Sequence, residues 1–334
     1  MTPDGSDGLD VVAVGNALVD VLSPASDEFL VEEGLQKGGT ALIDAQRSQE
    51  LYGRTGPGTE QSGGSAANTA VGVAALGGCC AFVGRVRDDL LGEVFTHDIR
   101  AAGVAFDTSP ATNGAPTGRC IILITPDAER TQNTYLGAAA ELGADDIDPA
   151  RFATAAVTYL EGYLFDQPEA KAAFRRAAKE AHAAGRRVAL SLSDTFCVER
   201  HRDDFLALVA DDVDVLFANE SEIGALYRVP RVDDALDSVR QHCGVAALTL
   251  GGLGSVVVGD GSVVEVPVHP VPGRVVDTTG AGDLYAAGFL FGLTHGHDLA
   301  RCGALGALAA SEIVSHVGAR PERSLAALAA PLLQ

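Results

Sequence analysis

The stretch Asp277-Thr-Thr-Gly-Ala-Gly-Asp283 is a short glycine turn that opens directly into an apolar run. Apolar residues recur at i, i+3, i+4 and i+7 from residue 284 to residue 291, which predicts a helix with a buried face. Gly280 and Gly282 permit backbone angles that a side chain would forbid, so consecutive N–H groups can point at one spot. Because the first turn of a helix leaves N–H donors unpaired at its positive end, this turn is suited to binding phosphate.

Asp283 stands where this turn would hold an anion. A carboxylate at that point can accept the proton of a hydroxyl group that attacks phosphorus. The alternative is that Asp283 merely belongs to the first turn of the helix and that the glycines only make a turn. For an isolated Gly-x-Gly-Asp this alternative is the better interpretation, so a catalytic role for Asp283 depends on the whole seven-residue string.

A second glycine turn, Ser62-Gly-Gly-Ser-Ala-Ala-Asn68, precedes a run of small residues that predicts another helix. Gly63 and Gly64 allow a ligand to approach the backbone closely, and Asn68 can offer both a donor and an acceptor to hydroxyl groups. A Gly-Gly turn before an alanine-rich helix is weak evidence when it is taken alone.

The two motifs together resemble the signatures of the ribokinase-like (PfkB) carbohydrate and nucleoside kinases, which are Gly-Gly-x-x-x-Asn and, later in the chain, Asp-Thr-x-Gly-Ala-Gly-Asp. The resemblance implies transfer of the γ-phosphoryl group of ATP to a hydroxyl group of a sugar or nucleoside. It makes Asp283 the catalytic base and the amides of Gly280, Ala281 and Gly282 the anion hole. It also implies that Thr279 and Gly282 contact ATP.

The segment Gly15-Asn16-Ala-Leu-Val-Asp20 matches Gly-Asn-x-x-x-Asp of the nucleoside-kinase branch. Taken alone, Asn16 is typical of a turn and Asp20 of a solvated strand edge. The resemblance instead implies contacts with the substrate, and Asp20 would bind ribose hydroxyls. The substrate-binding residues implied in this way are Asn16, Asp20, Gly63, Gly64, Asn68 and Asp283.

The motifs are most similar to those of the adenosine kinase branch, which serves purine salvage, so the 5′-hydroxyl of adenosine is the expected acceptor. Ribokinase-like and fructokinase-like sugar substrates stay open, as does a non-catalytic protein that binds a nucleotide or sugar. Tyr163, Phe165 and Phe196 are candidates for stacking on the base, although packing in the core is the commoner fate of such residues. An oxidoreductase is disfavoured because no Gly-x-Gly-x-x-Gly follows the first predicted strand.

The nucleotide side of the site is predicted from two segments. Asn219 and Glu222 match the Asn-x-x-Glu of the family, which orients Mg²⁺ through its water shell. Without the resemblance, the same pair is typical of a helix N-cap and its capping box, and both roles can coexist. Thr249, Gly251 and Gly254 match the family's Thr-x-Gly-x-x-Gly loop, which holds ATP together with Asn219.

Two further predictions concern charge near the phosphates. Family members commonly bind a monovalent cation such as K⁺ beside this motif, which implies a site near Asp277 and Thr279. Arg130 falls where relatives often place an arginine near the transferred phosphate. From the sequence, a surface arginine beside a turn is an equally good interpretation of Arg130.

The alternation of strands and helices in the second half predicts an α/β fold. The resemblance implies one ribokinase-like domain over residues 10–334, in which a central, mostly parallel sheet is flanked by helices. Residues 17–61 and 112–138 would form a small β-rich lid over the substrate pocket. The apolar run from residue 10 to residue 22 predicts one interrupted strand, and residues 1–9 are expected to be disordered.

Composition limits the partners. A net charge of −21 argues against nucleic acids and anionic membranes, so ATP and a small-molecule substrate are the expected partners of a monomer or homodimer. No bilayer-spanning run or basic signal peptide is evident, which favours the cytoplasm. The six cysteines lack metal-type spacing and predict buried thiols in a reducing compartment. His295 and His297 could bind a metal as a His-x-His pair, but solvated histidines are the expected outcome.

Overall fold

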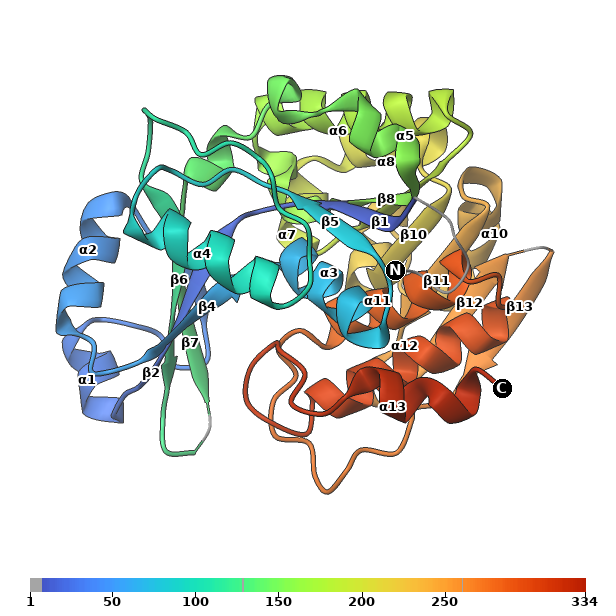
Figure 1. The fold of residues 1–334 in the computed structure, drawn as a ribbon. Coiled ribbons are helices and arrows are strands. Elements are labelled where there is room, and N and C mark those ends of the chain that lie inside the picture. The colour runs from blue at the N-terminus through green and yellow to red at the C-terminus, as the bar shows by residue number, and fades with distance from the viewer. Residues whose placement is uncertain (1–7, 128, 260) are drawn as a thin grey trace.

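The computed structural model describes residues 8–127, 129–259 and 261–334, which form two β-sheets and their helices (Figure 1). The larger sheet has eight strands in the order β13-β12-β11-β10-β9-β8-β1-β5. The strands are β1 (Leu9–Val14), β5 (Cys80–Val83), β8 (Ala155–Glu161), β9 (Arg187–Ser191), β10 (Val215–Asn219), β11 (Val245–Thr249), β12 (Ser255–Gly259) and β13 (Ser262–Val266). Neighbours from β5 to β11 are parallel, and β12 pairs antiparallel with both β11 and β13. The predicted α/β fold with a mostly parallel central sheet is confirmed.

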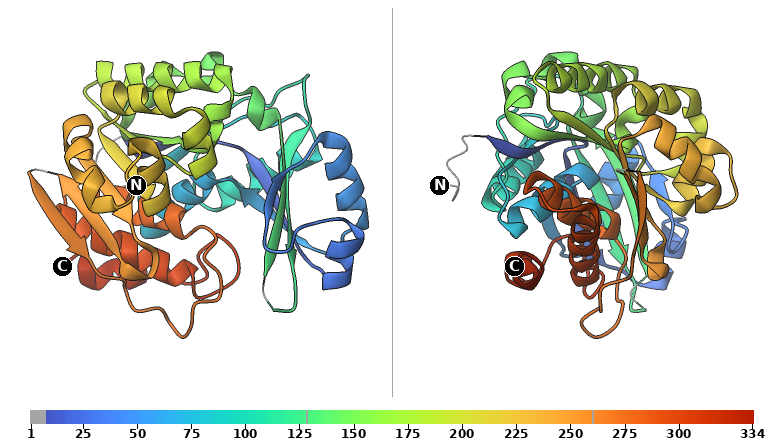
Figure 2. Two further views of the ribbon diagram at one scale, coloured as in Figure 1. Left: turned by 180° about the vertical axis from the view of Figure 1, so that it is seen from behind. Right: turned by 90° about the vertical axis from the view of Figure 1, so that its right-hand side faces the viewer.

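Two layers of helices cover the two faces of this sheet (Figure 2). Successive residues of a strand point to opposite faces, so Val11 and Ala13 pack into one core while Val12 and Val14 pack into the other. The first layer contains α3 (Ser65–Leu76), α4 (Leu90–Ala101), α11 (Ala281–Thr294), α12 (Leu299–Ile313) and α13 (Leu325–Ala329). The second contains α5 (Pro149–Thr154), α6 (Pro168–Ala183), α7 (Thr195–Arg200), α8 (Arg202–Asp212), α9 (Glu220–Tyr227) and α10 (Val232–His242).

The smaller sheet stands beside this three-layered body (Figures 1 and 2). Its order is β3-β7-β6-β2-β4, and its strands are β2 (Leu18–Pro24), β3 (Thr40–Leu42), β4 (Thr59–Gly63), β6 (Thr117–Ile124) and β7 (Arg130–Gly137). Helices α1 (Asp27–Glu32) and α2 (Ala45–Arg54) pack on one face, where Leu30 and Leu51 meet Ile121 and Leu123. The sheet also packs on the main body, because Val19 and Val21 of β2 belong to the first core and Ser62 of β4 bonds to Asp98 of α4.

The single strand predicted over residues 10–22 is wrong. The run is divided at Gly15-Asn16-Ala17, and β1 belongs to the large sheet while β2 belongs to the small one. The chain can cross between the sheets because Gly15 packs against Glu161 and Ala66, where a Cβ atom would overlap both side chains. The disorder predicted for residues 1–9 falls mainly on residues 1–7, which lie outside the described residues, whereas Leu9 already belongs to β1.

Candidate active site

A cavity of about 880 Å³ is enclosed by the carboxyl ends of the large-sheet strands, by the small sheet and by the N-termini of α3 and α11. The predicted residues that line it are Asn16, Asp20, Gly64, Asn68, Asn219, Glu222, Thr249, Thr279, Gly280, Gly282 and Asp283. Those that do not line it are Gly63, Arg130, Gly251, Gly254, Asp277 and Ala281. The fold therefore gathers motifs from distant parts of the sequence around one cavity, as expected at the carboxyl edge of a parallel sheet.

Asp283 lies in the first turn of α11 and is held by two donors from the other glycine turn. Ser65 Oγ donates a hydrogen bond of 2.6 Å to Asp283 Oδ1, and Asn68 Nδ2 donates one of 3.0 Å to Oδ2. Burial raises the pKa of Asp283, while the hydrogen bonds from Ser65 and Asn68 and the charge of Arg320 act in the opposite direction. The result is an oriented carboxylate that faces the cavity with a raised proton affinity.

The turn before α11 has the local geometry of an anion site. Gly280 is left-handed with φ of 76°, and a Cβ atom there would come within 2.7 Å of the Ala319 Cβ. Within the described part of the chain, the N–H groups of Gly282 and Asp283 have no hydrogen-bond acceptor. A Cβ atom on Gly282 would meet no protein atom within 4 Å, so the space beside this residue is open. Donors at a helix N-terminus beside open space can bind a phosphate group.

Asn16 is positioned by Glu161, a residue that no sequence motif marks. Asn16 Nδ2 donates a hydrogen bond of 2.6 Å to Glu161 Oε1, and the backbone N–H of Ala66 donates one of 2.7 Å to Oε2. Burial raises the pKa of Glu161 to about 7, against these hydrogen bonds. In the described structure, Asn16 Oδ1 and Asn68 Oδ1 are buried without a hydrogen-bond donor. Two unpartnered amide oxygens at one cavity are acceptors that a ligand with hydroxyl groups could satisfy.

Asp20 lies on β2 against the glycine turn. It is 9% exposed, and burial raises its pKa to about 7, opposed by the charges of Arg320 and Arg130. A Cβ atom at Gly63 would overlap the Asp20 carboxylate, and one at Gly64, whose φ is 102°, would overlap the Asn16 carbonyl oxygen. The prediction placed a ligand against both glycines, but here it is the protein's own atoms that require them.

Arg320 was also missed by the sequence analysis. Its side chain is partly buried, and its guanidinium donates hydrogen bonds to the Ser62 carbonyl oxygen, to Ser62 Oγ at 2.8 Å and to the Ala67 carbonyl oxygen at 3.4 Å. These acceptors flank the Gly63-Gly64 turn, so Arg320 ties the segment after α12 to the start of α3. Its positive charge also acts on Asp20 and Asp283.

Asn219 and Glu222 form a reciprocal capping box at the start of α9. Asn219 Oδ1 accepts a hydrogen bond of 2.8 Å from the Glu222 N–H, and the Glu222 carboxylate accepts from the Asn219 N–H at 2.9 Å and from Nδ2 at 2.7 Å. Burial raises the pKa of Glu222 to about 7. Both side chains nevertheless line the cavity, so the capping role leaves their remaining lone pairs able to face a ligand.

Thr249 pairs in register with Asn219 at the ends of β11 and β10 and lines the cavity. Gly251 and Gly254 lie in the 3₁₀ turn η4 (Gly251–Leu253) and just after it, with φ of 57° and 100°. A Cβ atom on Gly254 would overlap the Val266 carbonyl oxygen. These two glycines therefore shape the turn between β11 and β12, and the structure does not place them on the cavity wall.

Arg130 and Asp277 form a buried ion pair between the small sheet and the motif before α11. Arg130 Nη1 lies 2.8 Å from Asp277 Oδ2, but none of the Arg130 nitrogens has a hydrogen-bond acceptor of good geometry among the described residues. Asp277 also accepts from the backbone N–H of Thr279 at 3.0 Å and of Gly318 at 3.1 Å. With a guanidinium beside Asp277, this set of groups does not fit a monovalent cation. Arg130 is therefore buried, and the alternative of a surface arginine beside a turn is wrong.

The aromatic candidates divide between cavity and core. Tyr163 and Phe196, at 47% and 69% exposure, line the cavity, whereas Phe165 packs in the core with its ring 4.1 Å from that of Phe205. His295 stacks on Phe291. Across the described ranges, no three His, Cys, Asp or Glu side chains are grouped to hold a metal ion. All six cysteines, which lie within those ranges, have free thiols, and all but the partly buried Cys79 are buried.

Residues 35–324 match the model of the pfkB family carbohydrate kinases. The chain belongs to this family. It is accordingly a phosphotransferase that uses ATP and acts on an alcohol group of a nucleoside or sugar, as predicted. In the part of the chain that the structure describes, no helix combines the length and apolarity needed to cross a bilayer.

Relatives within the family act on different substrates. The chain is 31% identical over 332 residues to adenosine kinase of Saccharomyces cerevisiae, covering 92% of this chain and 95% of that protein. It is 28% identical over 295 residues to 5-dehydro-2-deoxygluconokinase of Shouchella clausii, covering 83% and 88%.

Solved structures show the same division. The structure of adenosine kinase from Sinorhizobium meliloti is 51% identical, with a TM-score of 0.89 and coverage of 97% and 99%. That of a probable sugar kinase from Rhizobium etli CFN 42 is 47% identical, with a TM-score of 0.90 and the same coverage. These likenesses confirm the ribokinase-like fold and leave the acceptor to be argued from the site.

Proposed function

We propose that this protein transfers the γ-phosphoryl group of ATP to the 5′-hydroxyl group of adenosine, with Asp283 as the general base. The observation that carries the proposal is the position of Asp283, a partly buried carboxylate in the cavity at the N-terminus of α11, oriented by Ser65 and Asn68. Because burial raises its pKa, Asp283 is a better proton acceptor than a solvated aspartate. A hydroxyl placed beside it loses its proton to the carboxylate as the oxygen attacks phosphorus.

Stabilisation of the transferring phosphoryl group falls to the turn before α11. The free N–H groups of Gly282 and Asp283 and the positive end of the helix are aimed at the open space beside Gly282. Gly280 and Ala281 contribute by fixing the turn. Arg130 does not line the cavity and contributes from behind it, by holding the segment before the turn through its ion pair with Asp277.

The ribose is assigned to the cavity wall formed by Asn16, Asp20 and Asn68. The unpartnered Oδ1 atoms of Asn16 and Asn68 can accept hydrogen bonds from the 2′- and 3′-hydroxyl groups. The Asp20 carboxylate can accept a stronger, charge-assisted bond. This set of acceptors fits a vicinal diol and would leave buried groups unpaired if the diol were missing.

The base is assigned to the exposed faces of Tyr163 and Phe196. Aromatic side chains that remain 47% and 69% exposed inside a cavity offer apolar surface that a planar ring can cover. Free hexoses have no such ring, so these two residues favour a nucleoside over a sugar. The likeness to proteins named adenosine kinase supports adenine in particular. Such an activity would return free adenosine to the nucleotide pool as AMP, in purine salvage.

The adenine nucleotide is assigned to the side of the cavity near Asn219, Thr249 and Thr279. Asn219 and Glu222 fit Mg²⁺ held through its water shell, because amide and carboxylate oxygens are its preferred ligands. When bound, Mg²⁺ neutralises charge on the phosphates. No step is assigned to a monovalent cation, since the guanidinium of Arg130 already lies beside Asp277.

Residues 17–61 and 112–138 are proposed to act as a lid. The small sheet supplies one wall of the cavity, through side chains such as Asp20, Leu42 and Gln132. The outer face of the sheet has its own core of Leu30, Leu51, Ile121 and Leu123, while β2 joins it to the main body through Val19 and Val21. Closure over bound nucleoside would exclude water from the phosphoryl group.

The proposal is tested by ADP release with Mg-ATP and a panel of adenosine, inosine, guanosine, ribose and fructose. Strong turnover with adenosine supports the assignment. Turnover with free sugars alone would refute the acceptor and keep the phosphotransfer chemistry. The sugar kinases among the relatives make this outcome the second candidate. No ADP from any acceptor, in a protein that still binds adenosine, would indicate a binding protein.

A further inference from the structure

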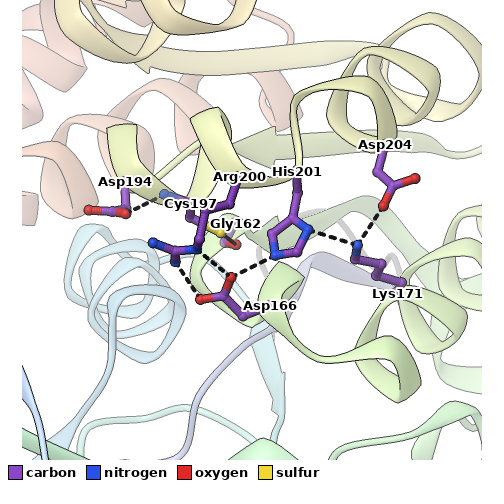
Figure 3. A network of polar contacts seen from close by, with 8 residues as sticks. All are labelled: Gly162, Asp166, Lys171, Asp194, Cys197, Arg200, His201 and Asp204. Carbon is purple, nitrogen blue, oxygen red and sulfur yellow. Dashed lines mark hydrogen bonds and ion pairs between the residues drawn. The ribbon is translucent and has the colours of Figure 1, made fainter.

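One polar network on the cavity wall has no part in the chemistry described above (Figure 3). Arg200 donates to Asp166 through two bonds, from Nε to Oδ1 at 3.2 Å and from Nη2 to Oδ2 at 2.7 Å. His201 Nε2 lies 2.7 Å from the same Oδ1. Behind it, His201 Nδ1 lies 3.2 Å from Lys171 Nζ, which donates to Asp204 at 2.5 Å. Both Asp166 and Arg200 line the cavity, whereas the rest of the chain of contacts leads away from it.

The ion pair of Asp166 and Arg200 lies next to Tyr163 and Phe196 along the chain. Asp166 and Tyr163 belong to the 3₁₀ turn η3 (Gly162–Asp166), where residues three apart lie on one face. Arg200 and Phe196 are four residues apart on α7 and also share a face. The two elements follow β8 and β9, which are adjacent parallel strands. A ring that covers Tyr163 and Phe196 therefore extends along the faces that carry Asp166 and Arg200.

The pair presents an acceptor and a donor side by side in a fixed orientation. The Asp194 side chain accepts from the Cys197 N–H at 2.6 Å and so fixes the start of α7. Burial acts against ionisation, but the hydrogen bonds from Arg200 and His201 hold the pKa of Asp166 below its ordinary value, so it is a charged acceptor. Arg200 Nη1 has no acceptor among the described residues, which leaves two N–H groups able to donate to a ligand.

The edge of adenine matches this arrangement. Its 6-amino group is a donor and the neighbouring N7 is an acceptor, whereas a 6-oxo purine presents two acceptors along the same edge. A carboxylate opposite the 6-oxygen would be repelled, and opposite the 6-amino group it is bonded. The geometry points to Asp166 and Arg200 as the residues that read the purine edge, with Asp166 accepting from the 6-amino group and Arg200 donating to the ring nitrogen. This assignment rests on the proposed adenosine kinase activity.

The test compares adenosine with purine riboside, the same nucleoside without its 6-amino group, at saturating Mg-ATP. The unmodified protein should favour adenosine in kcat/KM by about tenfold or more. Asp166→Asn should lower kcat/KM for adenosine by about tenfold and change that for purine riboside by less than about threefold. The matched control is Asp233→Asn, since Asp233 also pairs with an arginine but lies exposed on the surface. It should leave both values unchanged.

Three results would overturn the assignment while adenosine remains a good substrate. An unmodified protein that uses both nucleosides equally shows that the 6-amino group is not read, and this comparison needs no variant. An equal loss on both nucleosides in Asp166→Asn shows that the residue only supports α7. In Arg200→Gln, a raised KM for ATP with an unchanged preference between nucleosides would place Arg200 against the phosphates. If the unmodified protein does not turn over adenosine, the proposed function is wrong, and the assignment of Asp166 and Arg200 to the purine edge is wrong with it.

Discussion

Asp20→Asn is expected to stabilise the ligand-free protein at pH 8 far more than at pH 5. The Asp20 carboxylate is 9% exposed, and burial raises its pKa from 3.8 to about 7, with no hydrogen bond from the described residues to support the charge. Between those two values the unfolded chain releases this proton while the folded protein keeps it, so the free energy of unfolding falls as the pH rises. The decrease in the free energy of unfolding is complete once the pH exceeds the pKa of Asp20 in the folded protein. Asparagine carries no such penalty.

The size of the effect follows from the raised pKa. Between pH 5 and the folded value of about 7, each pH unit costs the unmodified protein about 1.4 kcal/mol, so the variant's advantage at pH 8 should exceed that at pH 5 by about 3 kcal/mol. Urea unfolding followed by far-UV circular dichroism suits a chain without tryptophan. Asp233→Asn, at an exposed position, should show no such difference between the two pH values.

The same substitution should impair function. Removing the charged acceptor is expected to raise the KM for adenosine by about tenfold or more, because ribose hydroxyls lose a charge-assisted bond. An equal stability gain at both pH values, or a loss at pH 8, would refute the reasoning, since it would mean that burial of Asp20 is not what raises its proton affinity. If the pH-dependent stability gain is seen but the KM for adenosine is unchanged, Asp20 affects stability and does not bind the substrate.

Three other predictions concern the phosphate end of the cavity. Ser65→Ala removes a donor worth about 1.5 to 3 kcal/mol to the charged form of Asp283, which raises the pKa of that carboxylate. The acid limb of the pH profile of kcat/KM should therefore move to higher pH, and an unmoved limb would contradict this hydrogen bond. Gly282→Ala should keep the melting temperature of the protein, because the new Cβ meets no atom of the described residues within 4 Å. It should lower kcat/KM for ATP by about tenfold or more, because the methyl group enters the space assigned to phosphate, and full activity would argue against phosphate beside this residue. Arg130→Met should lower the free energy of unfolding, measured by urea titration, by about 3 kcal/mol, because it leaves Asp277 buried without its cation. An unchanged free energy of unfolding would show that the ion pair does not stabilise the fold.

Local sequence was sufficient where a motif carries its own geometry. The turn before Asp283 needs glycine for its left-handed residue and is followed by an apolar helix, so its shape could be predicted. Asn219 and Glu222 are three residues apart, which defines a capping box whatever else they bind. The alternation of strands and helices likewise predicted a parallel sheet, which is confirmed.

What could not be predicted depends on contacts between distant segments. Glu161 reaches Asn16 across 145 positions, and Arg320 reaches Ser62 across 258, and neither residue has a local pattern that marks it. The division of residues 10–22 between two sheets was missed for a related reason. An apolar run records burial, but the sheet that buries each half is decided by partners elsewhere, here β8 and β6.

The glycines show a further limit of sequence reasoning. Gly63 and Gly64 lie in the turn before α3, and the atoms that exclude a side chain there belong to Asp20 and Asn16. Gly251 and Gly254 follow the pattern of a nucleotide loop and instead shape a turn outside the cavity wall. A glycine in a sequence marks either a close contact or a left-handed turn, and only the structure shows which.

The central claim is that Asp283 removes the proton from the acceptor hydroxyl, and one variant tests it most directly. Asp283→Asn keeps the size of the side chain and its place between Ser65 and Asn68 but removes its basicity. Adenosine binding, measured by calorimetry, should stay within about threefold, while ADP release with adenosine and Mg-ATP falls by about 10² to 10⁴. Turnover that stays within about tenfold of the unmodified protein, with binding intact, would contradict the account.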